Sequence, residues 1–133
     1  MKKLTVLLSL FLIVTSLQAQ TGWMWQNPLP QGNELRASSL NYVVGARGTV
    51  IQKNFYGWDI IDIGTRENLN DIYIEFSSKR GWIVGENGTI FYTDDGGENW
   101  TLQNSGTTET LHSVISAGYT TWVCSDNATL LRT

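Results

Sequence analysis

The carboxylates that crowd into one short stretch are the first candidates for chemistry. The stretch TIFYTDDGGENWTLQNSGT runs from Thr89 to Thr107 and holds Asp94 and Asp95 beside two glycines and a tryptophan. Such carboxylates could form a catalytic pair, bind calcium or close a turn. Side chains that are neighbours on a strand tend to point apart, and the alternating Asp and Asn ligands of a calcium loop are missing. We therefore interpret the stretch as a turn, with catalysis and calcium binding as alternatives.

Sialidase-type glycoside hydrolysis would need clustered arginines for a substrate carboxylate and a Tyr–Glu nucleophile pair. Arg36, Arg47 and Arg80 do not recur at equivalent positions of the repeat in this chain. Four acidic residues could offer a carboxylate pair, although the strand pattern makes them ordinary polar-face residues: Asp59, Asp62, Asp71 and Glu75. A fragment of a sialidase-type hydrolase is therefore the alternative to a protein without catalytic residues.

The single histidine and the single cysteine are the remaining candidates for nucleophilic chemistry. His112 lies in TLHSV, which lacks the strained Gly-x-Ser-x-Gly turn of a serine hydrolase, so we interpret it as a strand residue. Cys124 has no partner for an internal disulfide. Its apolar neighbours in TWVCS predict a small buried hydrophobic residue, not a reactive thiol.

The first residues have the pattern of an export signal. Lys2 and Lys3 precede the apolar run LTVLLSLFLIV, and small and polar residues follow, so residues 1–19 are predicted to be a signal peptide cleaved after Ala19. The run is too short to favour a membrane span, and no cysteine lies near the cleavage point to carry a lipid. Without the two lysines the formal charge falls from −3 to −5, which disfavours a nucleic-acid partner.

A repeat with a step of forty residues organises the remaining chain. Three stretches align, YVVGARGTVI from Tyr42, GWIVGENGTIF from Gly81 and TWVCSDNATLL from Thr121. Each indicates a strand, a polar turn and a second strand. In the middle copy the turn centre is Asn87-Gly88, a strong hairpin signal because both residues tolerate positive φ. The third copy has Ala128 in place of glycine, so this hairpin is expected to be less well formed.

Four strands per repeat are predicted, and no segment has helical periodicity. In the middle repeat they cover 69–76, 81–86, 89–93 and 99–104. Four short antiparallel strands every forty residues indicate a β-propeller blade, with a β-sandwich as the alternative. The sequence predicts an all-β partial propeller over residues 20–133, with about two and a half to three blades. The expected blades and an extra strand cover these ranges: 35–64, 65–106, 107–133 and 23–27.

The acidic stretch falls between the third and fourth strands of the middle blade. Its pattern Thr93-x-Asp95-x-Gly97-x-x-Trp100 resembles the Asp box of bacterial neuraminidase repeats. An aspartate in a turn accepts backbone N–H bonds, a glycine permits positive φ, and a tryptophan packs across a hairpin. These roles are structural, and the same is expected of the hairpin residues Gly85, Asn87, Gly88 and Thr89. In the families it resembles, the Asp box lies on the blade periphery, away from any active site.

A longer match is more specific. The stretch GWIVGENGTIFYTDDGGENWTLQNSGT resembles a repeat of the photosystem II assembly and stability factor family, a group of secreted seven-bladed propellers. Fourteen residues match the family pattern: Gly81, Trp82, Val84, Gly85, Gly88, Thr89, Ile90, Thr93, Asp95, Gly97, Trp100, Gln103, Ser105 and Gly106. The first blade departs from it, because QKNFYGW at Gln52 has lost the aspartate and is shorter.

The last repeat reaches Thr133 at the point where the next Asp box would begin. Propellers typically have four to eight blades, so a closed ring of three is not expected. A partial reading frame is one explanation, and self-association through unfinished blades is the other, because an unpaired strand edge invites pairing with another chain.

The expected function is therefore an exported, non-catalytic module that binds a protein or a cell-surface glycan, with no cofactor and no metal. Loop residues that could contact a partner are Arg66, Lys79 and Arg80. A role in photosystem assembly is implied by the resemblance alone. The glycosylation triplets that begin at Asn87, Asn99 and Asn127 are discounted, because those residues already have turn and strand roles.

Overall fold

The computed structural model describes residues 32–133, so the expected signal peptide at 1–19 and the expected strand at 23–27 lie outside the described part. The described chain forms three antiparallel sheets and contains no α-helix, which confirms the predicted all-β fold of propeller-like blades. The one helical turn in this part is the three-residue 3-10 turn Ala46–Gly48, which is the hairpin turn of the first repeat.

The first two sheets have four strands each, in chain order from the inner to the outer edge. The first blade contains β1 (Leu35–Ser39), β2 (Tyr42–Gly45), β3 (Val50–Lys53) and β4 (Trp58–Ile60). The middle blade contains β5 (Leu69–Ile74), β6 (Gly81–Gly85), β7 (Ile90–Thr93) and β8 (Thr101–Gln103). The third sheet has three strands: β9 (Leu111–Ala117), β10 (Thr120–Ser125) and β11 (Leu130–Arg132).

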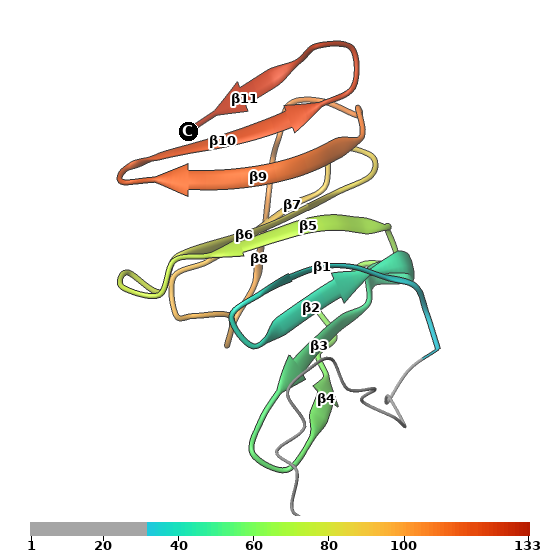
Figure 1. Cartoon of the computed structure of the whole chain (residues 1–133). Coiled ribbons are helices and arrows are strands. Elements are labelled where there is room, and N and C mark those ends of the chain that lie inside the picture. The colour runs from blue at the N-terminus through green and yellow to red at the C-terminus, as the bar shows by residue number, and fades with distance from the viewer. Residues whose placement is uncertain (1–31) are drawn as a thin grey trace, which may run out of the picture.

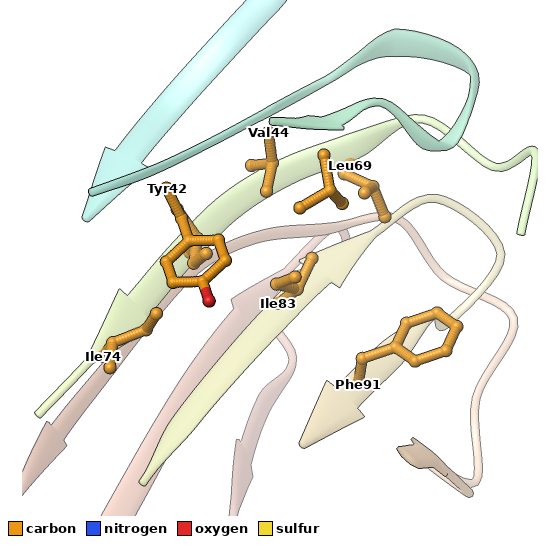
Figure 2. Close-up of a cluster of buried hydrophobic side chains, with 8 residues drawn as sticks. Tyr42, Val44, Leu69, Ile74, Ile83 and Phe91 are labelled. Carbon is orange, nitrogen blue, oxygen red and sulfur yellow. The ribbon is translucent and has the colours of Figure 1, made fainter. Parts of the chain in front are cut away.

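The three sheets stack face to face, with β1, β5 and β9 side by side at one edge of the stack (Figure 1). One buried cluster lies between the first and middle blades and includes Tyr42, Leu69 and Ile83, shown in Figure 2. A second lies between the middle and third blades, around Trp82 and Leu111. Each blade therefore buries its apolar side chains mainly against its neighbours in the stack.

The position of a blade in the stack explains the burial of its second strand. The sequence GWIVG of β6 is buried at every residue, because the middle blade is covered on both faces. A strand covered on both faces needs a continuous apolar run. The sequence TTWVCS of β10 alternates between buried and exposed residues, because one face of the third sheet has no neighbour within residues 32–133.

The exposure of Cys124 follows from this alternation and corrects the sequence-based prediction of a buried residue. Cys124 is exposed, and its Sγ lies 3.7 Å from the carbonyl oxygen of Ser113. Its counterpart forty residues earlier, Val84, is fully buried because the third sheet covers it. The neighbours of Cys124 in sequence were a poor guide, because alternate strand residues face opposite sides of a sheet.

The hairpin turns of the middle and third blades are alike. Asn87 and Gly88 have φ values of 52° and 66°, and Asn127 and Ala128 have 56° and 57°. The third hairpin keeps both hydrogen bonds of the middle one, including a Ser125 N–H to Thr129 carbonyl bond of 3.0 Å. The expected weakening at Ala128 is therefore not visible in the hydrogen bonds of this turn.

Candidate functional site

The Asp box forms a loop between β7 and β8 that satisfies its own polar groups. Thr93 Oγ1 donates to Asp95 Oδ1 at 2.7 Å and accepts from the backbone N–H of Gly97 at 3.0 Å. Asp95 Oδ1 also accepts from the backbone N–H of Asn99 at 3.0 Å, and Asp95 Oδ2 accepts from Asn99 Nδ2 at 2.7 Å. Both carboxylate oxygens of Asp95 are thus occupied by donors of the same loop.

The other two Asp-box residues contact the neighbouring blade. Gly97 has a φ of 98°, and a Cβ atom there would lie 2.6 Å from Cζ of Tyr42 in the first blade. The rings of Trp100 and Tyr42 meet edge to face, with centroids 6.3 Å apart. Burial raises the pKa of Tyr42, and the carboxylates of Glu98 and Asp95 raise it further. The loop therefore packs the middle blade against the first one.

The hydrogen bonds of Asp95 predict how this loop responds to acid. Donors from Asn99 and Thr93 hold the pKa of Asp95 well below its usual value of 3.8. Stability gained through such a carboxylate is present above its unfolded pKa and is lost as the pH falls through the folded pKa. We therefore expect Asp95→Asn to lower the thermal unfolding midpoint at neutral pH. We also expect it to weaken the dependence of that midpoint on pH below about pH 4.

Thermal unfolding followed by circular dichroism across a pH series measures both effects. Asp94→Asn is the matched control, because Asp94 is the exposed neighbour in the same turn and its replacement removes the same charge. Identical pH profiles for Asp95→Asn and the wild-type chain would contradict the prediction.

The hairpin turn of the middle blade contacts the loop that follows this blade. The turn contains Gly85, Asn87, Gly88 and Thr89. The backbone N–H of Gly88 donates to the carbonyl oxygen of Glu109 at 2.9 Å. A Cβ atom at Gly88 would lie 1.9 Å from the carbonyl oxygen of Thr107. The side chain of Asn87 donates to Glu67 Oε2 at 2.7 Å, so this tip also contacts the loop that precedes β5.

Each of the three inner strands carries one polar residue at the same position, and these residues form a row that the sequence did not reveal. We call this row the rim row: Arg36, Asn70 and His112. Each inner strand carries a β-bulge directly after its first leucine, so that two residues face one on the neighbouring strand. Leu35 pairs with Gly45 and Ala37 with Val44, which leaves Arg36 as the extra residue. Bulges of this kind redirect side chains and are frequent beside functional sites.

The rim row connects the three blades through side-chain contacts. Arg36 Nη1 donates to Asn70 Oδ1 at 2.6 Å, and Asn70 Nδ2 donates to the carbonyl oxygen of Leu111 at 2.9 Å. His112 Nε2 lies 2.6 Å from Asp126 Oδ1. The signal that could have found the row is a leucine followed by a polar residue at the start of every inner strand.

Carboxylates outnumber cations around the rim row. Arg36 lies 3.3 Å from Glu34 and 3.7 Å from Glu86, and these two carboxylates and Asp126 remain partly or largely accessible to solvent. Arg36 is the one side chain of the row that is always charged. This end of the stack therefore presents an acidic, hydrogen-bonding surface that extends over three blades.

The structure does not bring the three predicted contact residues together. Arg66 is exposed in the loop before β5, whereas Lys79 and Arg80 follow the opposite end of that strand. Arg80 pairs with Glu75 at 3.2 Å and donates to the carbonyl oxygen of Gly118 at 2.7 Å. Lys79 is exposed, and its carbonyl oxygen accepts from the N–H of Gly96 at 2.8 Å.

The arginines and carboxylates that could have served hydrolysis are also dispersed. Arg36 lies at the start of an inner strand and Arg80 beyond the far end of the next one, while Arg47 is exposed on the first hairpin. Asp71 accepts from the Ser113 hydroxyl at 2.7 Å and from the Val114 N–H, so it connects two blades.

The remaining acidic candidates bind nearby donors. Hydrogen bonds from Ser78, and then from Arg80, lower the pKa of Glu75. Asp59 accepts from Asn54, and Asp62 accepts from the N–H of Gly64. In the part of the chain that the structure describes, no three His, Cys, Asp or Glu side chains are grouped so that they could hold a metal ion. Over the same residues, no helix is long and apolar enough to span a membrane.

Stacked antiparallel blades with a forty-residue repeat and an Asp box between the third and fourth strands define a β-propeller repeat protein of the Asp-box class. The family model described as photosynthesis system II assembly factor YCF48 matches residues 39–133, and the chain belongs to this family.

Curated relatives match over shorter segments. The chain is 42% identical over 41 residues, 31% of its length, to the photosystem II assembly lipoprotein Ycf48 of Synechococcus sp. (strain CC9902). It is 34% identical over 68 residues, 47% of its length, to the chloroplastic photosystem II stability/assembly factor HCF136 of Arabidopsis thaliana. These segments span 12% and 17% of the two relatives. No solved structure matches the chain.

Proposed function

We propose that this chain is an exported β-propeller module that binds protein partners and supports their assembly without catalysing a reaction. Membership of an assembly-factor family supports this proposal, as do relatives whose names describe assembly and stability factors. The signal-like pattern of residues 1–19 supports export, and a relative named as a lipoprotein agrees with it. The Asp box and the hairpin residues then serve to hold the blades together.

The observation that carries the proposal is the rim row. Three blades place Arg36, Asn70 and His112 at the same bulged position, so each blade contributes a polar residue to this end of the stack. Glu34, Glu86 and Asp126 add negative charge beside it. Complementary charge guides association and selects partners. The partner segment proposed here therefore carries lysine, arginine or amide donors.

Two matched triple variants test this proposal. Each removes three negative charges, the first variant beside the rim row and the second at positions away from it. The rim variant carries Glu34→Gln, Glu86→Gln and Asp126→Asn. The control carries substitutions at exposed positions away from the rim: Asp59→Asn, Asp94→Asn and Glu98→Gln. Each chain is immobilised, and proteins from the membrane and envelope fraction of the source cells are bound to it at low and at high salt.

The rim variant is expected to retain its partner about tenfold more weakly than wild type and to lose most of the salt dependence of binding. The control variant is expected to bind like wild type. Equal retention by both triple variants, with thermal midpoints like that of wild type, would contradict a binding role of the rim row. Turnover of a fluorogenic sialoside by the purified chain would contradict the absence of catalysis.

A further inference from the structure

A recess of about 510 Å³ lies between the hairpin of the first blade and the loop that leads to the middle blade, and we call it the arginine recess. Arg47 on the hairpin and Arg66 on the loop both line it, and Ile60 and Ile61 add apolar surface. The hairpin and the loop are in contact, since a Cβ atom at Gly48 would lie 3.3 Å from the Cα atom of Arg66. Two cations and two apolar side chains therefore share one space.

The middle blade has a recess at the equivalent place. Its lining residues Thr107 and Thr108 correspond to Thr65 and Arg66 of the arginine recess. A recess between hairpin and loop is therefore a regular feature of a blade, and it does not depend on an end of the chain. The two cations are particular to the first blade.

Neither arginine of the recess has an acidic partner. In the described part of the chain, Arg36 and Arg80 form ion pairs with N–O distances of 3.3 and 3.2 Å, but Arg47 and Arg66 form none. All twelve acidic residues of the sequence lie in this part, so residues 1–31 contain no carboxylate that could pair with them. Both guanidinium groups are therefore available to an anion from outside the chain.

The hairpin tips of the other two blades each bind a carboxylate. In the middle blade Asn87 takes the place of Arg47, and its side chain donates to Glu67 Oε2 at 2.7 Å. In the third blade Asn127 donates to Glu109 Oε2 at 2.9 Å. In both cases the carboxylate comes from the loop directly before the inner strand. A side-chain donor and a carboxylate thus form a recurrent pair at this position.

The first blade differs in both members of this pair. Arg47 replaces the asparagine, and Asn33, two residues before the inner strand, replaces the glutamate. The side chain of Asn33 donates to Oγ1 of Thr49 at 2.9 Å. Asp62 also lines the recess, but its Oδ1 accepts from a backbone N–H of its own turn. The hairpin tip therefore keeps a donor, now a cationic and bidentate one, without the matching carboxylate of its own loop.

Arg47 has a backbone conformation that is unfavourable for arginine. Its φ is 57° and its ψ is 38°, in the left-handed region. Asparagine enters this region more readily than arginine does, and Asn87 and Asn127 have φ values of 52° and 56°. Strained residues of this kind cluster at ligand sites, where the strain is offset by function. A binding role explains why arginine stands where the other repeats have asparagine.

We propose that the arginine recess binds the carboxylate of an aspartate or glutamate side chain on a protein partner. This carboxylate takes the position equivalent to that of Glu67 and Glu109 in the other blades. Arg47 and Arg66 bind it through charge-assisted hydrogen bonds, and apolar neighbours of the acidic residue pack on Ile60 and Ile61. The inference rests on the proposed function in one respect, namely that the ligand belongs to a protein.

A peptide titration followed by NMR of the isotope-labelled full chain tests the proposal without the natural partner. The probe is a pentapeptide with a central glutamate between two leucines, blocked at both ends so that the glutamate is its one charge. It is expected to shift the amide signals of Arg47, Gly48 and Arg66. The same peptide with glutamine is expected to bind about tenfold more weakly. Inorganic phosphate is titrated in parallel, because arginine pairs also bind phosphate.

Arg47→Asn separates binding from folding, because it installs the residue of the other two repeats and removes the strain. It is expected to bind the glutamate peptide about tenfold more weakly, while its thermal unfolding midpoint stays equal to that of wild type or rises. Arg66→Gln is expected to weaken binding by a similar factor. Lys79→Gln is the matched control, because Lys79 is an exposed cation in the turn between β5 and β6, and this variant is expected to bind like wild type.

Asn33→Glu restores the carboxylate that the other blades have at this position. Its glutamate is expected to occupy Arg47 from within the chain and to block the peptide, weakening peptide binding about tenfold or more. Asn33→Gln is the control, because it keeps the amide group and adds no charge. It is expected to bind the peptide within about twofold of wild type.

Equal binding of the glutamate and glutamine peptides would overturn the proposal, as would wild-type affinity in Arg47→Asn or in Asn33→Glu. Absence of shifts at Arg47, Gly48 and Arg66 at any peptide concentration would also overturn it. Tighter binding of phosphate than of the peptide would assign the recess to a phosphate ligand instead. The rim row is not probed by the peptide. A failed titration beside a rim variant that loses its partner would therefore leave the proposed function intact.

Discussion

Replacing Ile83 by alanine is expected to lower the free energy of unfolding by about 2–5 kcal/mol. Ile83 is fully buried on β6 and belongs to the cluster between the first and middle blades. Its side chain lies among residues of both blades, as Figure 2 shows. The alanine variant would lose the apolar contacts of the side chain and leave a cavity, because two packed sheets cannot collapse onto it fully.

Urea unfolding followed by tryptophan fluorescence measures this change. Ile115→Ala is the matched control, because Ile115 is also a strand isoleucine but is 59% exposed on β9. We expect the control to change stability by less than about 0.5 kcal/mol, in line with exposed positions generally. Equal losses for the two variants would show that the cluster between the blades contributes little to stability.

Replacing Gly88 by alanine is expected to cost about 3 kcal/mol, from two sources. Gly88 has a φ of 66°, which is strained for a residue with a side chain. A Cβ atom would also lie 1.9 Å from the carbonyl oxygen of Thr107, and backbone cannot move aside as a flexible side chain can. Forcing an atom into a packed contact adds about 1–3 kcal/mol to the conformational cost.

Gly106→Ala separates these two contributions, because Gly106 has a φ of 74° and no neighbouring atom within 4 Å of the position a Cβ would take. It is expected to show the conformational cost alone. The third repeat supplies the reverse substitution. Ala128 has a φ of 57°, so Ala128→Gly is expected to stabilise the chain by about 1 kcal/mol. Losses of equal size at Gly88 and Gly106 would show that the contact with Thr107 can relax.

The fold could be predicted because each repeat contains similar local signals for turns and strands. The pairs Asn87-Gly88 and Asn127-Ala128 mark turns that take positive φ, and both hairpins form. The strands lie inside the predicted stretches but are shorter, as with β5, which ends at Ile74 and not at residue 76. Ends of strands depend on the partner strand, and that partner is not encoded locally.

The candidate site was harder to predict, because it depends on register and on neighbouring blades. A bulge shifts Arg36, Asn70 and His112 out of strict alternation, and the only sequence signal for it is the leucine that precedes each of these polar residues. Arg36 was a candidate for hydrolysis and not for binding, since its contact with Asn70 joins residues of different blades. The prediction for Cys124 was wrong for a related reason: its exposure depends on whether another blade covers the third sheet.

Because β6 is completely buried, the middle blade is expected to be the last part of the array to open. In a stacked array each unit contacts mainly its neighbours, so local openings proceed inward from the ends. The strands β10 and β11 can separate from the rest while the middle blade stays intact, because only one of their faces is packed. The amide protons of β6, covered on both faces, can exchange with solvent only when the array as a whole comes apart. The lifetime of the central blade therefore limits how fast a protease can cleave within β6.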